Sequence, residues 1–180
     1  MKRYVAILMV LCCMLGLAAC GAGDRTSNGN ATVSHAITAN DLMQAMRDAG
    51  YNVEVDTSAS VEDLDVPGAT TVTMLGYHKF DGMEKGGFAY FFEFNSSADA
   101  LSAYNELVSA LSGDGIYMRE VNGAHGEKSV FTDNADPDFG DTRILTQVEN
   151  TLVFALEQWD IDSTGSYDYE LNRILEDLGY

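Results

Sequence analysis

The residues best suited to chemistry lie in the stretch DIDSTGSYDYE, at 160–170. Four oxygen-bearing side chains occupy positions one, three, five and nine of a calcium-loop pattern: Asp160, Asp162, Thr164 and Asp168. Gly165 stands at position six, where such a loop turns sharply. Hard oxygen ligands at alternate positions around a Gly turn are what Ca²⁺ requires. One alternative for this stretch is therefore a calcium site.

The same stretch departs from the calcium pattern at its most important position. The bidentate carboxylate belongs at position twelve, which is Leu171, whereas Glu170 comes one residue early. A strand is predicted before the loop, where an EF-hand has a helix. The second alternative is a polar connection in which Ser or Thr caps the last helix and acids favour its positive end. The sequence favours this second alternative.

Other patterns for catalysis or metal binding are weak. The acidic stretch DNADPDFGD, at 133–141, matches no closed coordination loop and indicates a solvated surface loop. The three His residues have no zinc-ligand spacing, and no nucleophile elbow or phosphate-binding Gly loop occurs. A hydrolase with paired carboxylates stays an alternative, but 28 acidic residues allow no choice of a pair. The sequence predicts no catalytic residues and no cofactor other than the calcium alternative.

The first nineteen residues have the layout of a secretory signal peptide. Lys2 and Arg3 precede the apolar run YVAILMVLCCMLGLAA, which is shorter than the roughly 20 residues of a membrane-spanning helix. The run ends in Leu-Ala-Ala-Cys at 17–20, which resembles a bacterial lipobox at all four positions. The resemblance implies cleavage before Cys20 and diacylation of its thiol. An ordinary signal peptide is the less favoured alternative.

A flexible tether and one folded domain are expected after the leader. Residues 20–36 are rich in Gly, Ser, Asn, Thr and Ala, as flexible linkers are, and residues 37–180 form a domain of ordinary size. The chain has 10 Lys and Arg against 28 Asp and Glu, so loss of Lys2 and Arg3 changes the net charge from −18 to −20. This field repels nucleic acid and anionic lipid headgroups. It suits cationic partners or Ca²⁺, although solubility is the commoner reason for such acidity.

The residue pattern of 37–180 predicts an α+β domain. Helices are expected over 38–50, 96–112 and the C-terminal stretch, because apolar residues recur there at helical spacing after Ser or Thr caps. A strand at 51–55 precedes a long polar loop at 56–69, and hairpins are expected around 81–87, 122–123 and 149–150. The order indicates a mostly antiparallel sheet of five or six strands with helices packed on one face.

The C-terminal stretch carries a second resemblance. TLVFALE followed by ELNRILEDLGY is similar to the ends of small uncharacterised lipoproteins of Gram-positive gut bacteria, in which a comparable strand leads into a final helix. The similarity covers about thirty residues, includes no catalytic motif and implies no activity. The Gram type of the host stays open.

Aromatic residues gather around the first hairpin. In FAYFFEF, Phe88, Tyr90, Phe92 and Phe94 share one face of the strand, whereas Phe91 lies on the other. Core packing is the favoured reason for both sets. If the helices leave the Phe91 face open, that face is a partner site.

The expected protein is a lipid-anchored, extracytoplasmic domain at the cell membrane that binds an unknown protein or small molecule and has no enzymatic activity. The lipobox, the tether and the lack of a catalytic motif support this expectation. The alternatives are an envelope hydrolase using carboxylates and a calcium-stabilised interaction module.

Overall fold

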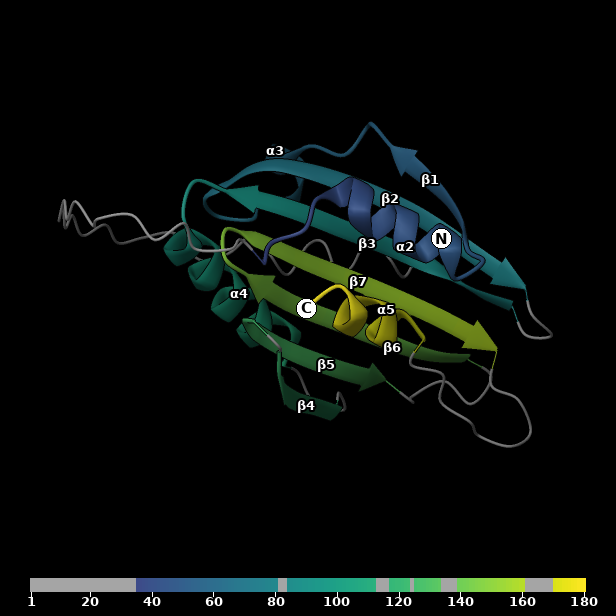
Figure 1. The fold of residues 1–180 in the computed structure, drawn as a ribbon. Helices are drawn as coiled ribbons and strands as arrows, with labels where there is room; N and C mark the ends of the chain where they lie inside the picture. The colour runs from purple at the N-terminus through teal and green to yellow at the C-terminus, as the bar shows by residue number, and fades with distance from the viewer. Residues whose placement is uncertain (1–34, 81–83, 113–116, 124, 134–138, 161–169) are drawn as a thin grey trace, which may run out of the picture. The chain divides into compact units, whose positions relative to one another are not determined.

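Seven strands form one antiparallel sheet in the order β1-β2-β3-β7-β6-β5-β4 (Figure 1). The strands are β1 (Asn52–Asp56), β2 (Ala69–Phe80), β3 (Glu84–Phe94), β4 (Tyr117–Asn122), β5 (Glu127–Asp133), β6 (Phe139–Val148) and β7 (Thr151–Asp160). The helices are α2 (Ala39–Asp48), α3 (Val61–Leu64), α4 (Ser97–Leu111) and α5 (Glu170–Asp177). This computed structural model describes residues 35–80, 84–112, 117–123, 125–133, 139–160 and 170–180, within a unit that spans His35–Tyr180.

Neighbouring strands in the chain pair as hairpins, and one long-range pairing joins the two halves of the sheet. β1, β2 and β3 form a meander, and β4 to β7 form another. β3 pairs with β7 from Lys85 opposite Trp159 to Glu93 opposite Thr151. The β6–β7 turn falls at Glu149, whose φ of 50° is the left-handed conformation that tight hairpin turns require. The predicted hairpin at 149–150 is confirmed.

The predicted helix starts at 38 and 96 are also confirmed. Thr38 accepts a hydrogen bond from the Asp41 backbone N–H, and the Asp41 carboxylate accepts one from the Thr38 N–H, which completes a capping box. Ser96 accepts from the Asp99 N–H in the same way at the start of α4. These caps satisfy backbone donors that have no partner within the helix.

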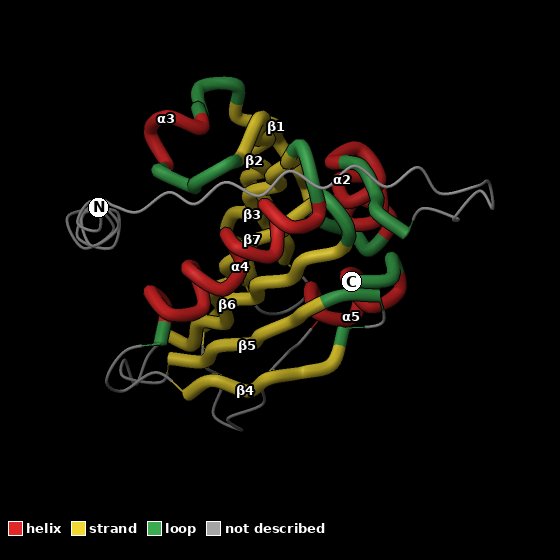
Figure 2. The backbone as a smooth tube through the Cα atoms, turned by 90° about the vertical axis from the view of Figure 1, so that its left-hand side faces the viewer, coloured by secondary structure: helices red, strands yellow, loops and turns green. Residues whose placement is uncertain are grey.

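The helices cover both faces of the sheet, where the sequence prediction placed them on one. α2 and α5 pack on the face that carries Phe91, whereas α3 and α4 pack on the face that carries Phe92 and Phe94. Figure 2 shows the two pairs on opposite sides of the sheet. The physical reason is the composition of the central strands: β3 and β7 have large apolar side chains on both faces, so each face needs a cover.

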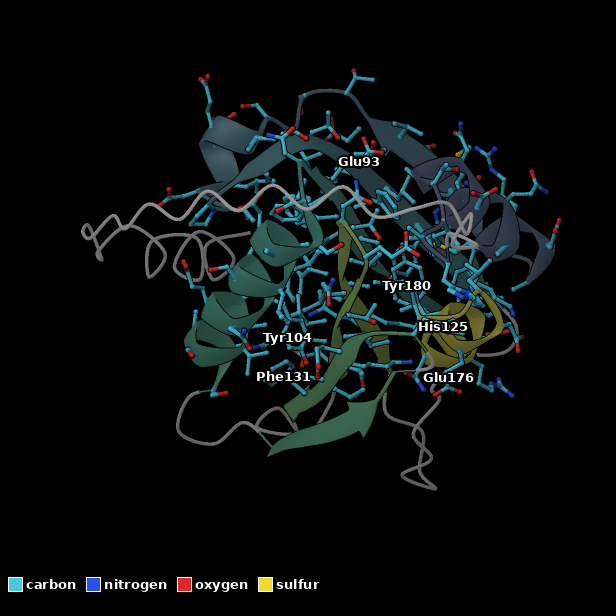
Figure 3. All side chains as sticks on the ribbon, turned by 60° about the vertical axis from the view of Figure 1, so that its left-hand side comes forward. Glu93, Tyr104, His125, Phe131, Glu176 and Tyr180 are labelled. Atoms are coloured by element: carbon cyan, nitrogen blue, oxygen red, sulfur yellow. The ribbon has the colours of Figure 1, made fainter. Side chains whose placement is uncertain are left out.

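Each face has its own core. On the α4 side, Tyr104 and Phe131 lie between α4 and the sheet, and the Tyr104 hydroxyl is 2.7 Å from Ser129 Oγ (Figure 3). On the α2/α5 side, Tyr180 is 0% exposed. Its hydroxyl pairs with that of Thr151 and accepts the backbone N–H of Ile37 at 3.3 Å. The last residue of the chain therefore ties the segment before α2 to the sheet.

The α+β class and the antiparallel sheet are confirmed, with three differences in detail. The sheet has seven strands where five or six were predicted. The predicted loop at 56–69 contains α3, which Ser60 caps by accepting the Glu62 N–H at 3.2 Å. The predicted loop at 133–141 is shorter, because β5 extends to Asp133 and β6 already begins at Phe139. In each case strand pairing or a local cap orders a stretch whose composition is polar.

Candidate functional site

Most of the site residues predicted from sequence lie outside the described residues. This holds for Cys20 and for Asp162, Thr164 and Asp168 of the calcium alternative. Asp160 is the last residue of β7, and its backbone pairs with Phe139. Within the described part of the chain, no group of three or more His, Cys, Asp or Glu side chains is placed to hold a metal ion. The lipidation and the calcium site stay predictions.

The idea that Phe91 lies on an open face is wrong. Its side chain is 1% exposed and packs in the core beneath α2 and α5. The face that carries Phe91 is therefore covered, and Phe91 has no free ring to offer a partner.

The less buried aromatic side chains lie instead on the opposite face, toward the N-terminal half of β3. The α4 core reaches the C-terminal half of β3 at Phe92 and Phe94, which are both 3% exposed. Phe88 and Tyr90, earlier in β3, and several of their neighbours on this face are only half-buried, although Leu156 opposite Phe88 is 7% exposed. We define the aromatic surface as this half-buried set, which comprises Met74, Gly76, Phe88, Tyr90 and Phe154.

The strand register arranges this surface in two cross-strand rows. In the first row, Glu54 of β1 is opposite Gly76 of β2, which is opposite Phe88 of β3. The second row runs across four strands through Asp56, Met74, Tyr90 and Phe154. Neighbouring strands are about 4.8 Å apart, so side chains within a row are in direct reach of each other. The surface is therefore continuous from β1 to β7.

The three rings of the aromatic surface support one another. The ring centroids of Phe88 and Tyr90 are 5.2 Å apart at an interplanar angle of 64°, and those of Phe88 and Phe154 are 6.3 Å apart at 62°. Tyr90 also stacks on buried Phe92, with centroids 6.0 Å apart. Edge-to-face pairs of this kind are favourable and hold the rings in place. The rings are thus held in a fixed arrangement, and a surface of this kind loses little side-chain entropy when it binds another molecule.

The edge of the aromatic surface is acidic. Glu54 and Asp56 are exposed on β1, at the β1 end of the two rows. Burial raises the pKa of Tyr90, and the negative charge of Asp56 raises it further. The Asp56 carboxylate therefore contributes to the electrostatic environment of Tyr90. At the opposite edge the first row continues from Phe88 through Leu156 to Arg143, whose guanidinium is paired with the Asp141 carboxylate at 3.0 Å.

A second group of chemistry-bearing side chains lies on the α2/α5 face. The Tyr51 hydroxyl donates to Glu157 Oε1 at 2.5 Å and lies 3.4 Å from Glu170 Oε2. Lys79 Nζ donates to Glu170 Oε1 at 2.8 Å, and Lys85 Nζ is 3.5 Å from Glu170 Oε2. We call these five residues the polar cluster. It brings two carboxylates together, but Glu157 is only 2% exposed, and the contacts join four elements (β2, β3, β7 and α5) to the residue before β1, so its evident role is structural.

The polar cluster and its neighbours give a prediction for alkaline pH. Burial, and then the charge of Glu157, raise the pKa of Tyr51 and of Tyr77 well above the usual value. The folded state therefore keeps these two hydroxyl protons at a pH at which the unfolded chain, with tyrosine pKa values near ~10, releases them. Below pH ~10 this difference costs the fold nothing, and above it the fold loses stability relative to the unfolded chain as the pH rises. We expect the free energy of unfolding to fall by about 1.4 kcal/mol per pH unit for each such tyrosine. Urea unfolding across this pH range measures the slope.

Tyr51→Phe is the matched variant for this slope. It removes one of the titrating hydroxyls and keeps the ring packed, so the fall above pH ~10 becomes shallower by the contribution of one tyrosine. An unchanged slope in Tyr51→Phe contradicts the assignment of the alkaline loss to this residue.

A pocket of about 250 Å³ lies on the α2/α5 face, between the start of α2 and strands β1 to β3. Its apolar floor includes Leu75 and Phe91, and Glu93 stands at its edge. Ligand pockets usually enclose about 300 to 1,000 Å³. This pocket is smaller, so the aromatic surface is the stronger candidate for a binding site.

Comparisons with known proteins assign no family. No family model and no curated protein matches the chain. Among solved structures, the fold is similar to the extracellular domain of PknH from Mycobacterium tuberculosis, with 7% identity, a TM-score of 0.48, and coverage of 80% of this chain and 90% of that chain. A likeness at this level carries no inference about ligand or activity. Among the described helices, none is long and apolar enough to span a bilayer.

Proposed function

We propose that this protein is a lipid-anchored domain on the extracytoplasmic side of the cell membrane, and that it binds a partner through the aromatic surface. The observation that carries the proposal is that surface: three half-buried, mutually packed rings on a part of the sheet face that none of the described helices buries. Contiguous apolar surface of this kind marks interaction sites more often than it occurs by chance. The anchor part rests on the lipobox ending at Cys20 and on the tether that follows.

The anchor is tested by Cys20→Ser in the full-length chain. The thiol is the only group on which the diacyl chain can be built, so the variant is expected to lose incorporation of labelled palmitate and to leave the membrane fraction. Labelling and membrane fractionation in a bacterial host measure both effects. Cys13→Ser is the matched control, since Cys13 lies inside the leader. A Cys20→Ser protein that still partitions with membranes contradicts the anchor.

The aromatic surface is tested by the affinity for a labelled peptide in which Phe alternates with Ser. An extended peptide of this pattern presents its rings on one side, as a strand lying across the two rows does. We expect Phe88→Ser to weaken binding about tenfold, because roughly 1.4 kcal/mol of apolar contact is lost. Fluorescence anisotropy with the full-length protein in detergent measures the affinity.

Two further variants separate binding from folding. Leu101→Ser changes another exposed apolar residue, which is 40% exposed on α4, and is expected to leave the affinity unchanged. Gly76→Trp adds a bulky side chain where an ideal Cβ meets no atom within 4 Å, so it blocks the surface without removing any packing. If Gly76→Trp binds the peptide as well as the wild type does, the aromatic surface is not the binding site.

A further inference from the structure

The first row of the aromatic surface has a gap in its middle. Gly76 lies between Glu54 and Phe88 in the register, and a Cβ built on it meets no atom within 4 Å. Two strand spacings separate the outer strands, so the α-carbons of Glu54 and Phe88 are about 10 Å apart across the gap. The empty volume above Gly76 is therefore a slot about one side chain wide, with a carboxylate on one side and an aromatic ring on the other.

Along β3 the slot is bounded by His78, since a Cβ built on Gly86 lies 3.5 Å from the His78 Cβ and 3.1 Å from the Tyr77 carbonyl oxygen. Gly86 lies two residues before Phe88 on the same face of the strand and, like Gly76, has no side chain. The position of Phe88 therefore has an empty neighbour at Gly76, and its ring packs against Tyr90 and Phe154. A flat group entering above Gly76 can reach the ring without displacing any side chain.

The charges around the slot select for a cation. Glu54 stands at the slot and Asp56 stands in the next row on the same face, and both are exposed. The face of an aromatic ring also attracts cations. His78 is the nearest titratable side chain on β2: it is opposite Gly86, two residues from Gly76 on the same face, and its Nε2 lies 3.3 Å from the Asn52 amide nitrogen. The slot therefore combines an acid, a ring and an adjacent second acid.

We propose that the slot above Gly76 binds an arginine side chain of a partner protein, with the guanidinium between the Glu54 carboxylate and the Phe88 ring. Arg suits this geometry better than Lys, because its planar group both stacks on a ring and forms paired hydrogen bonds with a carboxylate. The strongly acidic mature chain, with a net charge of −20 (8 Lys and Arg against 28 Asp and Glu), steers a basic partner toward it. This inference rests on the proposed function, since it names the chemistry of the partner at the same surface.

The test compares two labelled peptides that differ in one group. Both alternate Phe and Ser around a central residue, which is Arg in one peptide and its neutral isostere citrulline in the other. For the full-length protein in detergent, we expect the Arg peptide to bind about 5- to 10-fold more tightly at low salt. Fluorescence anisotropy gives both dissociation constants, and the ratio between them reports the charge alone.

Three variants test whether the preference for the Arg peptide arises at the slot. Glu54→Gln removes the carboxylate and is expected to reduce the ratio to about two or less. Gly76→Leu fills the slot and is expected to bring the ratio to about one, whereas Glu62→Gln on exposed α3 keeps the wild-type ratio. Thermal unfolding of each variant confirms that the fold is retained.

The outcomes distinguish this inference from the proposed function. Equal affinities of the two peptides for the wild type, or a ratio that Glu54→Gln leaves unchanged, overturn the arginine slot. If both peptides then still bind and Phe88→Ser weakens them equally, the aromatic surface stands without the slot. If neither peptide binds the wild type, the slot and the binding surface are both wrong.

Discussion

Replacing Gly87 with Ala is expected to destabilise the fold by about 3 kcal/mol or more, which is at the upper end for a single added methyl group. A Cβ on Gly87 overlaps the carbonyl oxygen of Leu156 and lies 2.9 Å from its carbonyl carbon. Both atoms belong to the backbone of β7, so no side-chain rotation relieves the clash. The Tyr77 hydroxyl, which donates to that same carbonyl at 2.7 Å, lies only 3.2 Å from the added carbon.

The clash in Gly87→Ala disturbs the pairing of β3 with β7, which joins the two halves of the sheet. Gly87 is opposite Glu157 where these two strands pair. Guanidinium chloride unfolding near neutral pH measures the loss. Gly76→Ala is the matched control, since its new Cβ meets no atom within 4 Å, and it is expected to be neutral or slightly stabilising. Equal stability of the two variants contradicts the close approach of β3 and β7.

The strands and helix ends could be predicted from sequence because their signals are local. The alternation in FAYFFEF indicated β3, and the Thr38–Asp41 pair indicated the start of α2. The presence of helices on both faces of the sheet was not predicted, although the sequence of β7 contained a signal for it. In TLVFALE of β7, Val153 and Ala155 point to one face and Leu152 and Phe154 to the other. A strand that is apolar on both faces indicates a sheet buried on both sides.

The aromatic surface was missed for a different reason. Alternation places Phe88 on the same face as Phe92, and the sequence indicated that this whole face is core. The length and direction of α4 decide which rings are covered, and only tertiary packing fixes them. The one local signal was Gly76 in the middle of a strand, where Gly weakens the strand and often marks a site of close approach. The polar cluster had no linear signal at all, because its members span residues 51 to 170.

The two faces of the sheet therefore differ in how completely helices cover them. Helices cover the α2/α5 face, and buried charges brace it. On the α4 face, the described helices leave the rings of the aromatic surface half-buried, and these rings already pack on one another. An open apolar surface costs solubility, and the acidic edge at Glu54 and Asp56, with the net charge of the whole chain, offsets that cost. A rigid, closed face behind the aromatic surface helps to keep its half-buried rings in a fixed arrangement.

The bracing of the closed face gives the second large expected effect. Glu170→Ala is expected to lower the free energy of unfolding by about 3 kcal/mol, because it removes the carboxylate that one buried and one largely buried ammonium group share. Lys79 and Lys85 contact Glu170 at 2.8 Å and 3.5 Å, and their side chains are 14% and 5% exposed. Lys79 also donates to the carbonyl of Ala49, at the end of α2, at 2.8 Å. Glu170 thus links the start of α5 to the end of α2 and to the central strands.

A control on the same helix separates burial from charge. Glu176 also contacts a lysine, at 3.6 Å from Lys128 Nζ, but its side chain is 50% exposed. Solvent screens such a contact, so Glu176→Ala is expected to cost less than about 1 kcal/mol. In the double variant Glu170→Ala with Lys79→Met, the loss is expected to be smaller than the sum of the two single losses, because no buried charge at position 79 remains to be compensated. Urea unfolding of the four proteins measures this coupling. Strictly additive losses mean that the contact between Lys79 and Glu170 contributes nothing to the fold, since a shared ion pair must appear as coupling between its two partners.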